Sequence, residues 1–169
     1  MNTVPPRCAR GAAAVEFALV FPVVFLMLYG LVTFGAVMYT QMAISRAVHD
    51  GARAVPLLPT PAEGVARDYT QVITEILESL AASAVVPPTD NQTLTSRRAW
   101  LEANVRGRIA ITEDGCTGAS AGDCATIRLN FPYGNTDGTR VFPSITLPGI
   151  GGTETWVPDA LFSVAVVRL

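Results

Sequence analysis

Residues 10–35 read RGAAAVEFALVFPVVFLMLYGLVTFG and place one carboxylate, Glu16, at the start of an otherwise uncharged apolar run. The run from Phe17 to Tyr39 contains no charged side chain. As an α-helix it is about 35 Å long, enough to cross a hydrocarbon core of about 30 Å. A cleaved secretory signal has a shorter apolar core, about 7–15 residues, followed by a small-residue cleavage site. The stretch therefore predicts a retained transmembrane helix with an acid at its entrance.

Charges beside the span predict how the chain is inserted. Arg7 and Arg10 precede the span in a short tail, and basic residues next to a span favour the cytoplasmic side. Arg46 and Arg53 follow the span, but they head a long domain, which is translocated largely regardless of charge. We expect a cytoplasmic N-terminus and a C-terminal domain outside the cytoplasm, which in a bacterium is the periplasm.

The overall composition argues against several classes of function. Half of the 169 residues are apolar, only 15% are charged, and the net charge is −2. Because phosphate binding needs a basic surface, nucleic acid is not expected as a partner. The one histidine, His49, argues against multi-histidine metal sites and histidine-dependent triads. We therefore expect neither an enzyme nor a metal or other cofactor.

The residues alone leave two interpretations of Glu16 open. In the first, the carboxylate simply lies among the lipid headgroups, one residue before the span. In the second, a peptidase cuts after Gly11, and the new amine of Ala12 lies one helical turn from Glu16. A charge inside the membrane costs about 2.5–3.5 kcal/mol on insertion scales. Pairing with an amine of the same or a neighbouring subunit recovers part of that cost.

The order of these residues resembles the type IV prepilin signal, in which a basic leader ends in glycine and an acid follows at the fifth position. Further matches in the first third of the chain are Val15–Glu16–Phe17, Pro22 and the stretch Gly51–Ala52–Arg53–Ala54. Together they resemble the TadE-like family of tight-adherence (Tad) pilus assembly proteins. The resemblance implies a pseudopilin or minor pilin, of TadE or TadF type, that a prepilin peptidase cuts between Gly11 and Ala12. It also implies that Glu16 pairs with the N-terminal amine during assembly.

The resemblance also implies partners and a location. The partners are other pilin and pseudopilin subunits, contacted through the N-terminal helix, the prepilin peptidase, the inner-membrane pilus assembly platform and the lipid bilayer. The location is the bacterial inner membrane, with incorporation into an extracellular pilus left open. The rival interpretation is an uncleaved single-pass protein whose periplasmic domain binds a ligand or a cell-wall component.

The chain is predicted to contain a leader (residues 1–11), a transmembrane and stalk helix (12–55) and a head domain (56–169). Within the head, apolar residues recur at helical spacing over residues 62–82, and a short helix is expected at 96–106. From Arg108 onward the period changes to two, which predicts about four strands: RIAIT, ATIRLNF, RVFPSITL and ALFSVAVVRL. The predicted fold is α+β and pilin-like, with the amphipathic helix packed on an antiparallel sheet.

Two of the three cysteines lie in one polar loop. Cys116 and Cys124 fall in DGCTGASAGDC, with a spacing too long for a CxxC redox motif and no neighbouring ligands for a metal site. Outside the cytoplasm the environment is oxidising, so a Cys116–Cys124 disulfide is favoured. It would contribute about 2–3 kcal/mol by restricting the unfolded loop. Cys8 would be lost with the leader or stay reduced in the cytoplasm.

Overall fold

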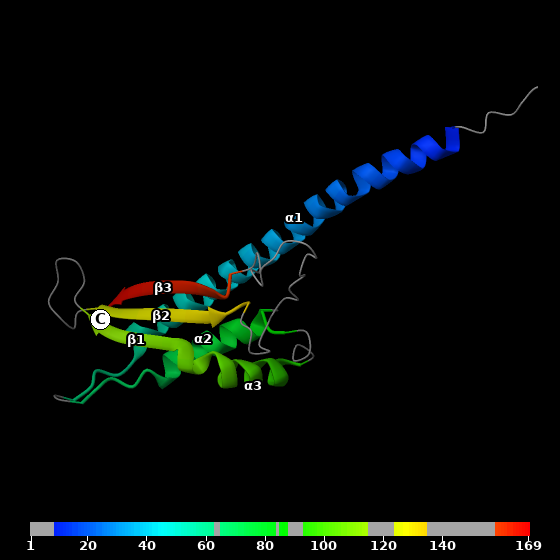
Figure 1. The fold of residues 1–169 in the computed structure, drawn as a ribbon. Helices are drawn as coiled ribbons and strands as arrows, with labels where there is room; N and C mark the ends of the chain where they lie inside the picture. The colour runs from blue at the N-terminus through cyan, green and yellow to red at the C-terminus, as the bar shows by residue number, and fades with distance from the viewer. Residues whose placement is uncertain (1–8, 63–64, 84, 88–92, 115–123, 135–157) are drawn as a thin grey trace, which may run out of the picture. The chain divides into compact units, whose positions relative to one another are not determined.

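The computed structural model describes residues 9–62, 65–83, 85–87, 93–114, 124–134 and 158–169 (Figure 1). Its helices are α1 (Ala9–Ala54), α2 (Thr70–Ala82) and α3 (Leu94–Asn104), with short 3-10 turns η1 (Val55–Leu57) and η2 (Arg106–Arg108). Its strands are β1 (Ile109–Asp114), β2 (Cys124–Pro132) and β3 (Ala160–Arg168). The chain forms two compact units, Met1–Met38 and Tyr39–Leu169. The last part of α1 therefore belongs to the same unit as the sheet.

The first unit contains the apolar part of α1. Residues Ala13–Leu57 form a helix long and apolar enough to cross a membrane. The apolar side chains in this part of the helix are exposed, Met27 to 79%, as a lipid-facing helix requires. Pro22 lies inside the helix without ending it. The predicted span is thus present as one continuous helix.

In the second unit, α1 has a buried face and a charged face. Ile44, Ala47 and Val48 are fully buried, whereas Arg46 and His49 are exposed. The helix ends at Ala54, just before the PLLPTP stretch, because proline cannot continue a helix without loss of a backbone hydrogen bond. The small side chain of Ala47 thus lies on the packing face, and His49 lies at the surface.

The three strands form an antiparallel sheet in the order β1-β2-β3. Ile127, Leu129 and Phe131 of β2 are at most 1% exposed, and they lie opposite Ala165, Ser163 and Leu161 of β3 on the buried face. The described strands confirm three of the predicted ones. The segment RVFPSITL, residues 140–147, lies outside the described residues.

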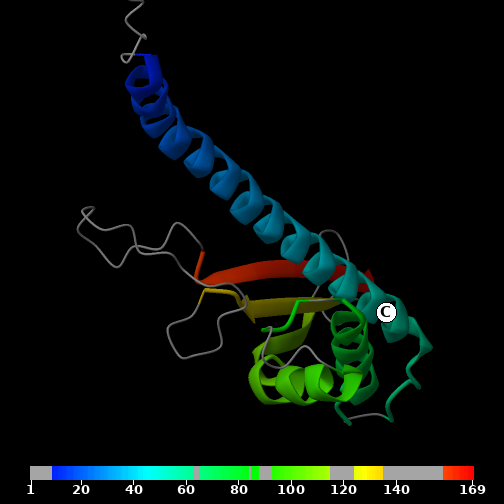
Figure 2. The same cartoon turned by 90° about the vertical axis from the view of Figure 1, so that its right-hand side faces the viewer.

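Helices cover the buried face of the sheet, which confirms the predicted α+β class (Figure 2). Helix α3 reaches the sheet through Trp100, whose ring centroid lies 6.2 Å from that of Phe131. Helix α2 buries Val72, Ile76, Leu77 and Leu80.

The predicted range for the amphipathic helix, 62–82, is wrong at its beginning. The structure places the first residue of α2 at Thr70. The Asp68 carboxylate accepts hydrogen bonds from the backbone N–H of Thr70, at 2.9 Å, and from its hydroxyl, at 2.6 Å. Such local side-chain bonds favour a turn over continued helix. They also hold the pKa of Asp68 below its ordinary value.

Candidate assembly site

The first candidate site surrounds Glu16 on α1. Glu16 is exposed on the helix, and the residues that line the same surface are the uncharged Gly11, Val15, Leu19 and Val20. Val15 and Phe17, its neighbours in sequence, are each 66% exposed. Among the described residues, no basic side chain forms an ion pair with Glu16. An acid in such surroundings needs a partner from outside the described part of this chain, or water.

Gly11 and Ala12 lie inside the first turns of α1, which begins at Ala9. A Cβ atom added at Gly11 would meet nothing within 4 Å, so packing within the structure does not explain a glycine there. Residues 12 and 16 are separated by four positions, and helix geometry places them on one face. The structure thus brings two of the predicted site residues, Ala12 and Glu16, to neighbouring positions on the helix.

A second feature, which sequence reasoning missed, joins the end of the apolar run to the sheet. Thr40, the residue after Tyr39, is only 2% exposed and lies beside the buried Tyr133. Burial raises the pKa of Tyr133, and the neighbouring Thr40 hydroxyl partly offsets this. Next to it, Gln41 Nε2 donates to the backbone carbonyl of Phe162 at 2.9 Å. The first polar residues after the span therefore contact the segment after β2 and the beginning of β3.

Backbone hydrogen bonds beside this joint connect the segment after β2 to the segment before β3. The N–H groups of Tyr133 and Gly134 both donate to the Asp159 carbonyl at 3.0 Å. A Cβ at Gly134 would lie 2.8 Å from the carbonyl oxygen of Pro158, so this close approach requires glycine. The signal for the joint was weak in sequence, because Thr40, Tyr133 and Phe162 are far apart along the chain.

Gly51 allows α1 to approach α2 closely. A Cβ at this position would overlap Ile76 Cγ1 and lie 2.8 Å from Ile76 Cδ1. One turn away, the Ser79 hydroxyl donates to Asp50 Oδ2 at 2.9 Å. The glycine in the Gly51–Ala54 stretch thus has a packing role in the head.

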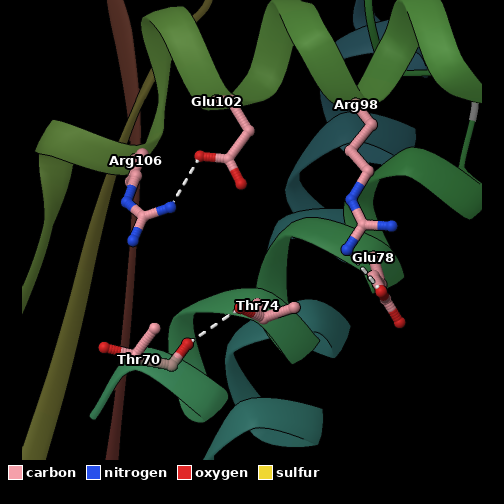
Figure 3. Close-up of polar contacts among 6 residues, drawn as sticks. All are labelled: Thr70, Thr74, Glu78, Arg98, Glu102 and Arg106. Carbon is pink, nitrogen blue, oxygen red and sulfur yellow. Dashed lines mark hydrogen bonds and ion pairs between the residues drawn. The ribbon is translucent and has the colours of Figure 1, made fainter. Parts of the chain in front are cut away.

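Two ion pairs lie on the surface of the head (Figure 3). Arg98 of α3 reaches Glu78 of α2 at 2.6 Å, and Arg106 reaches Glu102 at 2.9 Å. Half-exposed pairs of this kind contribute about 0–1 kcal/mol. In the part of the chain that the structure describes, no three His, Cys, Asp or Glu residues form a group able to hold a metal ion.

The predicted disulfide falls partly outside the described residues. Cys124 opens β2 and is 1% exposed. Its sulfur is disulfide-bonded, but Cys116 and Cys8 both lie outside the described residues. The Cys116–Cys124 pairing stays a prediction.

Comparison with known proteins identifies one family. Residues 11–53 match the family model described as TadE-like protein, and the matched segment lies entirely within α1. This confirms the resemblance for the helix that carries Gly11, Glu16 and Gly51. The family is a structural family of pilus proteins rather than one of enzymes. No curated protein and no solved structure matches the chain.

Proposed function

We propose that this chain, whose first helix matches the TadE-like family, is a minor pilin-like subunit required for assembly of a Tad pilus and hence for adhesion. In this proposal it is a single-pass protein of the bacterial inner membrane with a cytoplasmic N-terminus and a periplasmic head. A prepilin peptidase removes residues 1–11. The observation that carries the proposal is the position of Glu16, an acid on the apolar surface of α1 one turn from Ala12.

The proposed assembly step is electrostatic. Cleavage after Gly11 leaves a positive amine on Ala12, four residues from the Glu16 carboxylate. In lipid, the unpaired charge costs about 2.5–3.5 kcal/mol, and an amine from a neighbouring helix lowers that cost when the two helices pack in register. Subunits with a free Glu16 are thus drawn toward other pilin helices, which the inner-membrane assembly platform brings together.

The end of α1 is part of the head in this proposal. Gln41 Nε2 donates to the Phe162 carbonyl, and Gly51 packs closely against Ile76. The residues of α1 from Tyr39 onward therefore belong to the same compact unit as the sheet.

Intact mass of the membrane-isolated protein tests the processing step. In cells with the cognate peptidase, the mature chain should begin at Ala12, and Gly11→Phe should leave Met1 in place. Gly30→Phe is the matched control, because Gly30 is also free of contacts within 4 Å but lies away from the cut. A wild-type chain that still begins at Met1 would instead favour the uncleaved protein with a ligand-binding or cell-wall-binding head.

Replacement of the acid tests the pairing step separately. Glu16→Gln keeps the size of the side chain and removes its charge, so insertion and cleavage should continue while fibre production falls. Thr33→Val is a control within the same span, since it removes only the bond from the Thr33 hydroxyl to the Tyr29 carbonyl. Normal fibre production by a cleaved Glu16→Gln chain would contradict a pairing role.

A further inference from the structure

Strand β3 places its larger apolar side chains on the solvent side of the sheet. Its buried face carries Leu161, Ser163 and Ala165. The alternate residues Phe162, Val164 and Val166 are 64%, 52% and 60% exposed. The open face of an antiparallel sheet ordinarily carries polar residues. A row of exposed apolar residues therefore indicates an interaction site.

Polar groups complete this face next to the apolar row. In the register of the sheet, Arg128 lies opposite Val164 and Asn130 lies opposite Phe162. A hollow on this face has a volume of about 410 Å³ and is lined by Arg108, Ala110, Arg128, Leu129, Asn130, Phe162, Ser163 and Val164. Of these described lining residues, two are arginines and none is an acid. The hollow is therefore electropositive.

We propose that the outer sheet face, defined by Arg108, Arg128, Asn130, Phe162, Val164 and Val166, docks a second protein. The matching surface would carry aliphatic side chains flanked by carboxylates. Arginine binds carboxylate through two parallel hydrogen bonds, and the apolar row gains by burial. The proposal does not depend on cleavage after Gly11 or on the pairing of Glu16.

A lipid surface is the alternative occupant of an apolar face in a chain that carries a membrane span. A cross-link to lipid would identify it.

A second copy of this chain fits the charge of this face less well than a protein of different sequence does. A two-fold contact would place the same face on both sides, so Arg128 of each copy would approach the arginines of the other. Like charges facing each other are unfavourable. The charge of the hollow thus favours an acidic partner of different sequence.

Photo-cross-linking of the full chain in the cells that produce it tests the proposal. Val164→p-benzoylphenylalanine should cross-link to another protein. The peptide attached to it, identified by mass spectrometry, should carry aspartate or glutamate beside aliphatic residues. The same substitution at Gln71, an exposed residue of α2, is the control and should give no such product.

Charge reversal then tests the role of the arginine. Arg128→Glu should lower the cross-link yield by about tenfold or more, and Arg53→Glu, on the exposed face of α1, should not. Reversal of the mapped partner carboxylate to arginine should restore the yield with Arg128→Glu. The proposal is overturned by a cross-link to lipid, to a second copy or within the same chain, by a partner peptide without acids, or by no cross-link.

Discussion

Substitution of Gly51 by alanine probes the closest approach of two helices in the head. In an exposed helix, glycine to alanine stabilises by about 1 kcal/mol, because alanine has the higher helix propensity. At Gly51 the added methyl group would overlap Ile76 Cγ1, and it would lie 3.4 Å from the Val72 carbonyl oxygen. Overpacking of a filled core costs about 1–3 kcal/mol, and Ile76 has no exposed surface into which it can move. We expect Gly51→Ala to lower the free energy of unfolding by about 1 kcal/mol.

The assay is urea unfolding of the full chain in detergent micelles, followed by tryptophan fluorescence. Trp100 reports on the head because its ring contacts Phe131. Gly107→Ala is the matched control, since a Cβ there meets nothing within 4 Å. The control should leave the free energy of unfolding within about 0.5 kcal/mol of the wild type.

A double-mutant cycle separates steric overlap from other effects. Ile76→Ala removes both atoms that obstruct the new methyl group, at a cost of about 2–5 kcal/mol by itself. In that background, Gly51→Ala should be neutral or stabilising, which gives a coupling energy of about 1–3 kcal/mol. The reasoning fails if Gly51→Ala stabilises the wild-type head, or if the coupling energy falls below about 0.5 kcal/mol.

Three further predictions concern the head. Gln41→Ala should lower the free energy of unfolding by about 1 kcal/mol, because it removes the hydrogen bond from Gln41 Nε2 to the Phe162 carbonyl; an unchanged free energy of unfolding would contradict a contribution of this bond. Burial and the hydrogen bond to Glu113 raise the pKa of Tyr69 to about 12. The Tyr69 hydroxyl therefore loses its proton at lower pH in the unfolded chain than in the folded one, and the free energy of unfolding should fall as the pH rises from about 10 to 12. Urea unfolding should show a smaller fall in Tyr69→Phe, and an equal fall would exclude this tyrosine as a source. Mass spectrometry of a non-reduced digest should find Cys116 linked to Cys124, and Cys8→Ser should leave that link intact.

The sequence predicted those helices and strands whose residue pattern is set within the element, without reference to distant contacts. Two examples are the uncharged run that ends at Tyr39 and the alternating residues of β2, which both follow from burial along one element. The beginning of α2 was missed because Val65 and Tyr69 fit the helical period, whereas Asp68 competes for the backbone N–H of Thr70. Periodicity measures burial, and it does not register this local hydrogen bond.

The residues of the candidate site also divide into those that the sequence could predict and those that it could not. Gly11 and Glu16 could be selected from sequence, because an acid beside an apolar run is conspicuous without any tertiary contact. The joint of Thr40 with Tyr133 and of Gln41 with Phe162 depends on the chain folding back. The residues next to Thr40 and Gln41 in the sequence give no sign that these two side chains contact segments so far along the chain.

Strand β3 shows why periodicity alone cannot distinguish residues that stabilise the fold from residues that bind a partner. The segment ALFSVAVVR is apolar at both odd and even positions, so its pattern predicts a strand without stating which face is inside. In a head with helices on one side of the sheet, only one face of β3 is covered by the part of the chain that the structure describes. The covered face carries Leu161, Ser163 and Ala165, while Phe162, Val164 and Val166 are exposed. A sequence selected for the stability of this head alone would place the larger side chains inward. The reverse arrangement is explained if a partner covers the outer face, and Arg128 determines the charge of that partner.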